Sequence, residues 1–271
     1  MGLLERRVAF VTGVARGQGR NHAVRLAAEG ASVIGIDIAA PVSEYSGYSA
    51  ATASDLAETV TLLEAQGPPF IIETVDVRDS AAMDGLLAKA VPALGDRLDI
   101  VVANAGIVSW SRFWEMPDDQ WQSIIDVNLT GVWRTMKSAV PHMLAAGNGG
   151  SMIVVSSVAG IKSLPAQAHY SAAKHGLVGL AKAAAIELGE YGIRVNTIHP
   201  WGVATPMTQD NRMHETLDAH PHYRMSFCSV LSGFTLAEPS DISDAVVWLA
   251  SDLSRTVTGA QLPLDMGATT V

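Results

Sequence analysis

The sequence predicts an α/β fold in which helices cover both faces of one doubly wound parallel sheet. Short runs rich in β-branched residues alternate with longer helical segments along the whole chain. The short runs are apolar throughout and lack the alternation of apolar and polar residues that a half-solvated sheet shows. A parallel sheet buried on both faces explains both observations, because each parallel crossover places a helix on one face.

The individual elements follow from the same patterns. The predicted strands are Val8–Thr12, Ser32–Ile36, Phe70–Thr74, Ile100–Ala103, Met152–Ser156, Arg194–Ile198 and Gln261–Leu264. The predicted helices include Arg20–Glu29, Asp55–Gln66, Trp121–Ala146, Tyr170–Glu190 and Asp241–Ala250. A chain of 271 residues is long enough for one buried core and short for two, so we expect a single domain over residues 1–271.

Two segments show neither the apolar periodicity of a helix nor that of a strand. Residues 39–54 are rich in Ser, Ala and Tyr, and residues 201–238 contain several histidines, methionines and aromatic residues. Each follows the carboxyl end of a predicted strand, where ligands bind in sheets of this kind. Long irregular segments in compact domains usually form lids or binding loops, so we expect both to cover a ligand site.

Composition limits the partners and the compartment. Asp and Glu outnumber Lys and Arg by 27 to 18, a charge of −9 that favours neither nucleic acid nor an anionic membrane. The one cysteine, Cys228, excludes an intrachain disulfide and a thiolate metal cluster. No run reaches the roughly eighteen apolar residues of a membrane span, and the first predicted strand begins too early for a cleaved signal peptide. We expect a cytoplasmic protein.

A glycine-rich turn joins the first predicted strand to the first helix. It reads Thr12-Gly13-Val14-Ala15-Arg16-Gly17-Gln18-Gly19. Glycines let the backbone approach a pyrophosphate, and the helix N-terminus offers free N–H groups. Asp37 follows at the end of the second strand, where a carboxylate can accept both adenosine ribose hydroxyls. The predicted dinucleotide contacts are therefore Gly13, Arg16, Gly17, Gln18, Gly19, Asp37 and Ile38.

Arg16 leaves the choice between NAD and NADP open to argument. A cation at this position could pair with a 2′-phosphate, which favours NADP. Asp37 occupies the ribose position, however, and a phosphate there would place two anions in contact. We therefore predict NAD, with Arg16 either solvated or paired with Asp37.

The next two strands end in further candidates. Asp76 and Val77 could bracket the adenine, or Asp76 could cap the helix that follows. Asn104, Ala105 and Gly106 are small enough to let a nucleotide lie against the backbone, and Asn104 can tie neighbouring strands together. A simple strand-ending turn is the alternative for these three residues.

Tyr170 and Lys174 stand four residues apart, on one face of a predicted helix. The ordinary pKa of tyrosine, about 10, is too high for a base at neutral pH. A fixed cation nearby, helped by the positive charge of the nicotinamide, would stabilise the phenolate and lower this pKa. Ser157, at the end of a predicted strand, can hold a substrate oxygen beside Tyr170. Asn128, inside a long predicted helix, can bend that helix and hold Lys174 through a water molecule. A helix-packing hydrogen bond is the alternative role for Asn128.

Taken together, these motifs resemble the short-chain dehydrogenase/reductase family over essentially the whole chain. The resemblance implies a Rossmann sheet, usually of seven strands, and a catalytic set of Asn128, Ser157, Tyr170 and Lys174. It also implies that Tyr170 and Lys174 contact the cofactor and that Pro200, Val203 and Thr205 surround the nicotinamide. Two departures are Ala103, where an asparagine is common, and Trp201, where many relatives have glycine; the second makes the contacts near Pro200 less secure.

A narrower resemblance is to the branch that includes carveol dehydrogenases. It rests on Gly17-Gln18-Gly19-Arg20-Asn21-His22-Ala23, on the long segment after Asp37 and on Tyr170-Ser-Ala-Ala-Lys174-His175-Gly176. This branch is described as mycofactocin-dependent, with NAD reoxidised in place by another redox cofactor. Residues 39–54 directly follow Asp37, so their position predicts a lid over the adenosine half of the cofactor, to which Tyr45 and Tyr48 could contribute apolar rings with polar tips. We expect this lid to keep NAD tightly bound and residues 201–238 to form the substrate loop.

The side chains around the expected active-site mouth are mostly apolar. They are Trp110, Trp114, Trp201, Met207, Met213, Met225 and Phe227, and core packing alone could explain about half of them. Apolar walls fit a hydrophobic secondary alcohol or ketone of terpenoid type. His214, His220 and His222 could suggest zinc, but they lie in an irregular segment without well-placed further ligands, so we expect no metal.

Two other functions compete with an alcohol dehydrogenase. A carbonyl or 3-oxoacyl-type reductase would use the same residues, although Asp37 and the apolar loop disfavour it. A catalytically silent NAD-binding sensor or scaffold would be expected to lack Tyr170 or Lys174, and both are present. The two longest predicted helices carry more small apolar residues than one core readily buries, and the family resemblance implies that such helices form a subunit interface. Closed symmetry favours a dimer or a dimer of dimers, and we expect a homotetramer.

Overall fold

The computed structural model describes residues 2–271 and contains a seven-stranded parallel sheet in the order β3-β2-β1-β4-β5-β6-β7. The strands are β1 (Val8–Thr12), β2 (Ser32–Asp37), β3 (Phe70–Thr74), β4 (Ile100–Ala103), β5 (Gly150–Val155), β6 (Ile193–Pro200) and β7 (Gln261–Leu264). All seven predicted strands are confirmed, with ends that move by at most two residues. The strand order reverses between β1 and β4, which opens a crevice at their carboxyl ends.

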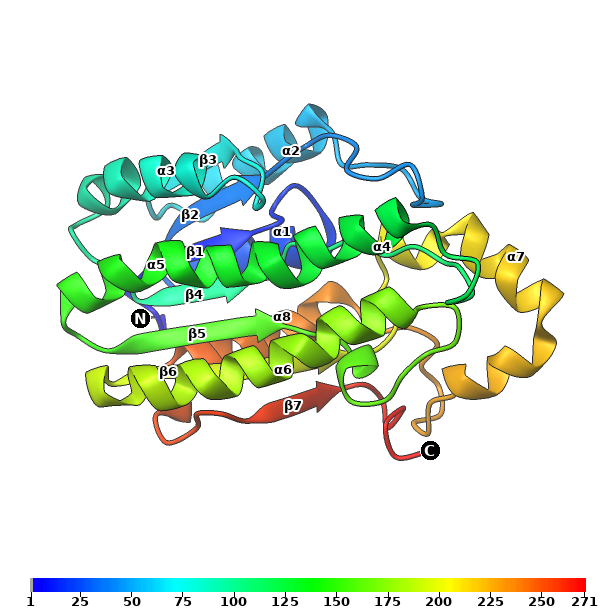
Figure 1. Cartoon of the computed structure of the whole chain (residues 1–271). Helices are drawn as coiled ribbons and strands as arrows, with labels where there is room; N and C mark the ends of the chain where they lie inside the picture. The colour runs from blue at the N-terminus through cyan, green and yellow to red at the C-terminus, as the bar shows by residue number, and fades with distance from the viewer. Residues whose placement is uncertain (1) are drawn as a thin grey trace.

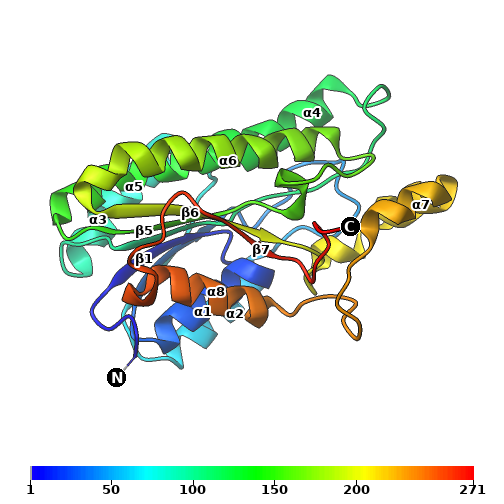
Figure 2. The ribbon, with the colours of Figure 1, turned by 90° about the horizontal axis from the view of Figure 1, so that it is seen from below.

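Helices cover both faces of this sheet (Figures 1 and 2). One face carries α3 (Ser80–Ala93), α5 (Val132–Ala146) and α6 (Ala168–Leu188), and the other carries α1 (Gly17–Ala28), α2 (Ala53–Glu64) and α8 (Pro239–Ala250). Neighbouring residues on a strand enter different cores: Phe10 packs with the first set of helices and Val11 with the second. Both sides of the strands are therefore buried, as their continuous apolar character predicts.

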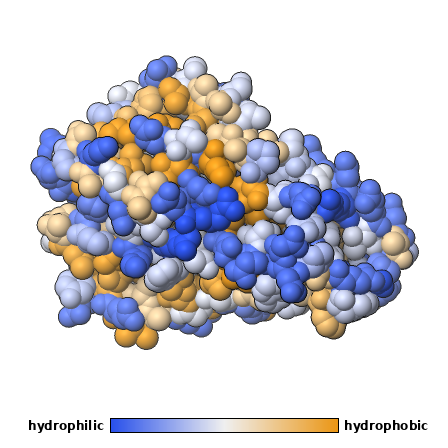
Figure 3. All heavy atoms as spheres, turned by 45° about the horizontal axis from the view of Figure 1, so that its top comes forward, coloured by the Kyte–Doolittle hydropathy of each residue, from blue (hydrophilic) through white to orange (hydrophobic). Residues whose placement is uncertain are grey.

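The helices differ from the prediction more than the strands do. The helix predicted over Trp121–Ala146 is α4 (Asp118–Ile125), then a π-helical stretch Asp126–Gly131, then α5. Helix α1 begins at Gly17, three residues before the predicted start, and no bounds were predicted for α3, the helix that follows Asp76. Within residues 2–271, no helix has the length and apolar character that a membrane crossing requires. On the face drawn in Figure 3, apolar patches lie between polar groups.

The two segments predicted to be irregular differ from one another. Residues 39–52 contain neither helix nor strand, and Thr52 ends the segment by capping α2, with its hydroxyl accepting from Asp55 N at 3.2 Å. Residues 201–238 contain a helix that was not predicted, α7 (Asn211–Ala219). Leu217 is its one buried residue and has only Met213 as an apolar neighbour at helical spacing, so the apolar pattern is too short to predict a helix. The Asp210 side chain caps this helix instead.

Candidate active site

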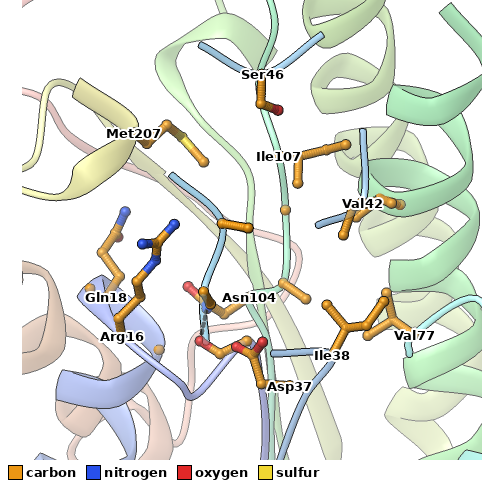
Figure 4. A pocket seen from close by; sticks show the side chains of 18 of the residues that line it. Arg16, Gln18, Asp37, Ile38, Val42, Ser46, Val77, Asn104, Ile107 and Met207 are labelled. Carbon is orange, nitrogen blue, oxygen red and sulfur yellow. Dashed lines mark hydrogen bonds between the residues drawn. The ribbon is translucent and has the colours of Figure 1, made fainter. Parts of the chain in front are cut away.

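A cavity of about 330 Å³ lies at the carboxyl ends of the central strands. It brings together fifteen of the predicted site residues: Gly13, Arg16, Gly17, Gln18, Gly19, Asp37, Ile38, Asp76, Val77, Asn104, Ala105, Gly106, Tyr170, Lys174 and Thr205. Pro200, Val203, Asn128 and Ser157 do not line it. Segment 39–54 adds wall residues whose identity was not predicted, among them Val42 and Ser46 (Figure 4).

The glycine-rich turn brings the backbone close to this cavity. A side chain at Gly19 would place its Cβ 2.0 Å from the carbonyl oxygen of Gly13, so only glycine fits. Helix α1 begins here, and no side chain caps its first turn. Its free N–H groups and the positive end of its dipole fit a pyrophosphate.

Asp37 stands at the end of β2, at the lower end of the cavity in Figure 4. Its two carboxylate oxygens accept from Ala15 N at 2.9 Å and from Ala39 N at 2.8 Å. Each oxygen has a second lone pair, so the carboxylate can still accept hydroxyl groups. The two backbone bonds aim it at the cavity, as a contact to an adenosine ribose requires.

Arg16 is not paired with Asp37, so that alternative is wrong, whereas its partly exposed guanidinium agrees with a side chain in contact with solvent. Its guanidinium donates to the hydroxyl and the carbonyl oxygen of Ser49, in segment 39–54. Asp37 already accepts hydrogen bonds from the backbone N–H groups of Ala15 and Ala39, while the carbonyl of Ser49 accepts from the Arg16 guanidinium. Arg16 therefore ties the glycine-rich turn to this segment.

Asp76 lines the cavity but does not cap a helix, which corrects the alternative proposed for it. It forms a two-pronged ion pair with Arg78, whose Nε and Nη2 lie 2.8 and 2.6 Å from Oδ2. Burial raises and the bonds to Arg78 lower the pKa of Asp76, with a net lowering. Asp79, three residues later, is the cap of α3 and accepts from Ala82 N at 3.0 Å.

Asn104 ties β4 to β1, as predicted. Its side-chain amide donates to Thr12 O at 2.9 Å, and its backbone N–H donates to the hydroxyl of Thr12 at 3.1 Å. These bonds hold the ends of the two central strands together at the reversal of strand order. The floor of the cavity is thereby fixed.

Tyr170 and Lys174 lie in the first turns of α6 and line the same cavity. The ammonium nitrogen of Lys174 is 5.5 Å from the centre of the Tyr170 ring and donates to Val155 O at 2.8 Å. Ser157 follows β5, and its hydroxyl is close enough to Tyr170 to hydrogen-bond with the phenol. The structure thus brings the predicted acid/base, cation and hydroxyl together.

The predicted lowering of the Tyr170 pKa relies on the charge of the nicotinamide as well as on Lys174, so it stays a prediction for the NAD complex. Among the protein's own groups, burial is the largest influence on the Tyr170 pKa. Burial raises it to about 12, although the hydrogen bond with Ser157 opposes the change. Burial also lowers the pKa of Lys174 to about 7, which leaves the amine only partly charged at neutral pH. A cation that has lost its own hydration cannot by itself hold Tyr170 as a phenolate.

Asn128 lies in the π-helical stretch and is fully buried. Its Oδ1 accepts from Ile107 N at 2.8 Å and its Nδ2 donates to Ile107 O at 2.7 Å. The interrupted helix agrees with the predicted bend. A Cβ at Gly106 would be 3.2 Å from Asn128 Oδ1 and 3.7 Å from Lys174 Nζ, so the side chains of Asn128 and Lys174 both approach this glycine.

Apolar side chains form a second wall beyond Tyr170. Phe227 stacks at 5.8 Å on Trp110 and at 5.8 Å on Trp201, and Tyr170 packs in the same group with Leu164. Met207 lines the cofactor cavity. Trp114 and Met225 are 61% and 81% exposed and are not part of this buried group.

Sequence reasoning missed His199. This residue lies on β6, is fully buried and places Nδ1 2.8 Å from the carbonyl oxygen of Ser157. An isolated histidine in an apolar strand carries no signal for such a role. Of the histidines noted for zinc, His220 and His222 stack on Tyr223 at 5.0 and 4.5 Å, and no three His, Cys, Asp or Glu converge within residues 2–271.

Comparison with known proteins agrees with this geometry. Residues 13–269 match a short-chain alcohol dehydrogenase family model described as enoyl-(acyl carrier protein) reductase. An uncharacterized NAD-dependent oxidoreductase of Mycobacterium tuberculosis is 53% identical over 98% of this chain and 97% of its own. The (−)-trans-carveol dehydrogenase of Rhodococcus erythropolis is 44% identical, over 99% of both chains.

A solved structure gives the same result in three dimensions. The short-chain dehydrogenase from Mycobacterium paratuberculosis bound to NAD superposes with a TM-score of 0.97, covers 100% of both chains and is 44% identical. The resemblance inferred from the motifs is confirmed. This chain belongs to the short-chain dehydrogenase/reductase family.

Proposed function

We propose that this protein is an NAD-dependent dehydrogenase that oxidises a hydrophobic secondary alcohol and, in reverse, reduces the matching ketone. The observation that carries the proposal is the shared cavity. Tyr170 and Lys174 line the same space as the glycine-rich turn and Asp37. An acid/base group therefore lies beside a site that fits a dinucleotide.

The residues present fit NAD. The uncapped first turn of α1 suits a pyrophosphate, and the carboxylate of Asp37 suits the ribose hydroxyls while repelling a 2′-phosphate. The names of the M. tuberculosis relative and of the M. paratuberculosis structure agree with this choice. When bound, oxidised NAD supplies the hydride acceptor and a positive charge beside Tyr170.

The chain's own side chains bind the alcohol and remove its hydroxyl proton. Ser157 holds the alcohol oxygen, and Tyr170 accepts its proton. Tyr170 must be a phenolate before this transfer, which leaves it a neutral phenol. Lys174 stabilises that phenolate, and the positive charge of the cofactor offsets the burial that otherwise raises the pKa of Tyr170. Asn128 fixes the backbone at Ile107 and so maintains the wall opposite Lys174.

The substrate class follows from the wall beyond Tyr170. Trp110, Trp201 and Phe227 surround the reacting end with apolar surface, which suits a ring-shaped hydrophobic alcohol. The carveol dehydrogenase from R. erythropolis agrees with a terpenoid-like substrate. We infer the same class for this protein.

Segment 39–54 supports retention of NAD. It reaches three parts of the rim: Arg16 bonds to Ser49, Ser46 donates to Val108 O at 3.2 Å, and Tyr45 donates to Asp119 at 2.8 Å. A lid tied at several points must open before NAD leaves, which slows its dissociation. NAD that stays bound needs reoxidation in place, so we propose an external redox cofactor of mycofactocin type as partner.

Assembly and compartment are also part of the proposal. Trp121, Trp133 and Ile186, on α4, α5 and α6, are 41%, 43% and 83% exposed. Burial of such side chains favours a homotetramer. Light scattering at micromolar concentration should report four subunits, and a monomer would contradict the interface. We place the protein in the cytoplasm, where its single cysteine stays reduced.

The function is tested with protein as purified. Extractable nucleotide is measured first, and then a panel of hydrophobic secondary alcohols, carveol included, is assayed with an artificial electron acceptor. We expect bound NAD, alcohol-dependent reduction of the acceptor and slow turnover with added NAD alone. Protein that binds NAD but oxidises no alcohol and reduces no ketone in the panel would favour the sensor hypothesis instead. Rapid exchange of labelled NAD within seconds would contradict the lid.

A further inference from the structure

Segment 39–54 and the substrate loop 201–238 are bonded to each other at Gly47 and Asp210. The N–H of Gly47 donates to Asp210 Oδ2 at 3.1 Å, and the N–H of Asn211 donates to Gly47 O at 3.2 Å. Each segment thus provides hydrogen-bond partners for backbone or side-chain groups of the other. Neither can move away without breaking both bonds.

Arg212 makes a second connection between the same segments. Its Nη1 donates to Tyr45 O at 2.9 Å and its Nη2 donates to Glu44 O at 3.1 Å, while the guanidinium lies 6.0 Å from the centre of the Tyr45 ring. A single cation therefore holds two consecutive carbonyl groups of segment 39–54. Arginine suits this task because its donors form a rigid fork.

Asp210 is fully buried and has little freedom to find other partners. Its Oδ1 also accepts from Arg212 N at 2.8 Å, at the start of α7. A Cβ added to Gly47 would lie 2.1 Å from Asp210 Oδ1, so the two segments approach as closely as glycine allows. A buried carboxylate that loses one hydrogen-bond donor is left desolvated and unsatisfied. Breaking this contact is therefore unfavourable in free energy.

The joined segments cover different parts of the site. Ser46 and Tyr48 of segment 39–54 line the cofactor cavity, and the hydroxyl of Tyr48 accepts from Val108 N at 3.3 Å. The substrate loop contributes Met207 to that cavity and Trp201 and Phe227 to the wall beside Tyr170. The same two contacts between the segments, at Asp210 and at Arg212, must therefore break whether the substrate or the cofactor enters or leaves.

We propose that Asp210 is a positioning residue that joins the cofactor lid (residues 39–54) and the substrate loop (residues 201–238) into one unit that opens and closes over both ligands. The lid and the loop open together, so an alcohol that holds the loop closed also slows release of the cofactor. Linkage requires the reverse as well: bound cofactor strengthens binding of the alcohol by the same factor. This inference rests on the proposed function, which assigns the two ligands to the two segments.

The first test needs no substrate. Hydrogen exchange is followed in wild type and in Asp210→Asn, which retains a helix-capping side chain but loses the charge. We expect faster exchange in residues 43–49 and in residues 206–219 together. Faster exchange in only one of the two segments would overturn the proposal, because they would then open independently. Glu215→Gln, an exposed acid on the same helix, is the matched control and should leave both unchanged.

The second test measures release of labelled NADH, chased with unlabelled NADH, with and without carveol. NADH and an alcohol cannot react, so only binding is observed. In wild type we expect carveol to slow release; Asp210→Asn should speed release about tenfold or more, the effect of one lost charge-assisted hydrogen bond, and should weaken the effect of carveol. Arg212→Gln should act in the same direction through the other connection.

Failure of this inference differs from failure of the proposed function. Wild-type release rates in both Asp210→Asn and Arg212→Gln would overturn the shared closure even if the protein oxidises alcohols. Protein that oxidises no alcohol but shows joint opening of both segments would overturn the function and leave the closure in place. Thermal unfolding of each variant checks that the fold is intact.

Discussion

The imidazole Nδ1 of His199 lies 2.8 Å from the carbonyl oxygen of Ser157, and its Nε2 lies 2.8 Å from the hydroxyl of Thr197. A carbonyl oxygen only accepts, so Nδ1 carries the proton and Nε2 accepts from Thr197. Burial lowers the pKa of His199, which favours this neutral form. Strand β6 thereby holds the backbone of the serine that we place against the substrate oxygen.

His199→Leu should lower turnover about tenfold, since it releases the Ser157 carbonyl and loosens the serine hydroxyl. The measurement is a double-mutant cycle with Ser157→Ala. If His199 acts through Ser157, its replacement has little further effect once the hydroxyl is gone. An equal loss in both backgrounds would instead mean that His199 only supports the fold.

Tyr170→Phe should leave the fold and NAD binding nearly intact and lower turnover by about 10²–10⁴, the range for a lost acid/base group. Single-turnover reduction of bound NAD by a good alcohol substrate measures the chemical step directly. Extractable NAD in the variant is the control for cofactor binding. A variant that retains more than about a tenth of wild-type turnover would show that another group moves the proton.

Asp37→Ala should weaken discrimination between NAD and NADP, chiefly because the repulsion toward a 2′-phosphate is removed. Asp37→Asn separates charge from shape, since it keeps an acceptor for Ala15 N and loses the negative charge. Equilibrium binding of both cofactors to all three proteins gives the answer. Wild-type protein that prefers NADP would refute the assignment of Asp37.

The stability of the fold should fall in acid because of His22. Burial between α1 and α8 lowers its pKa to about 3, and its Nδ1 lies 2.7 Å from the hydroxyl of Ser243. The unfolded chain binds the proton below its ordinary pKa of about 6.5, while the folded protein stays neutral down to about 3, so stability is full above 6.5 and declines as the pH falls through this window.

The loss from His22 at pH 5 is about 2 kcal/mol relative to neutral pH. Denaturant unfolding at pH 7, 6 and 5 measures it, with His22→Gln as the comparison. The variant should show a shallower pH dependence, although it is less stable at neutral pH. Parallel curves for the two proteins would mean that other groups govern acid stability.

The local features of this protein were readable from its sequence. Strands buried on both faces are apolar without interruption, so all seven were found. Motifs of fixed spacing, such as Tyr170 with Lys174, also keep their meaning in isolation, because four residues on a helix always share a face. The dinucleotide turn and Asp37 were found for the same reason.

The remaining features depended on contacts between distant segments. Arg16 bonds to Ser49, Asp210 to Gly47 and His199 to Ser157, and each pair is separated by more than thirty residues. Helix α7 has one buried residue, and a capping acid marks its start. Burial also raises the pKa of Tyr170, an effect that the spacing of residues in the sequence does not reveal. Sequence spacing determined which groups could act, whereas the choice of partners and the loss of water around each group were decided only when the chain packed.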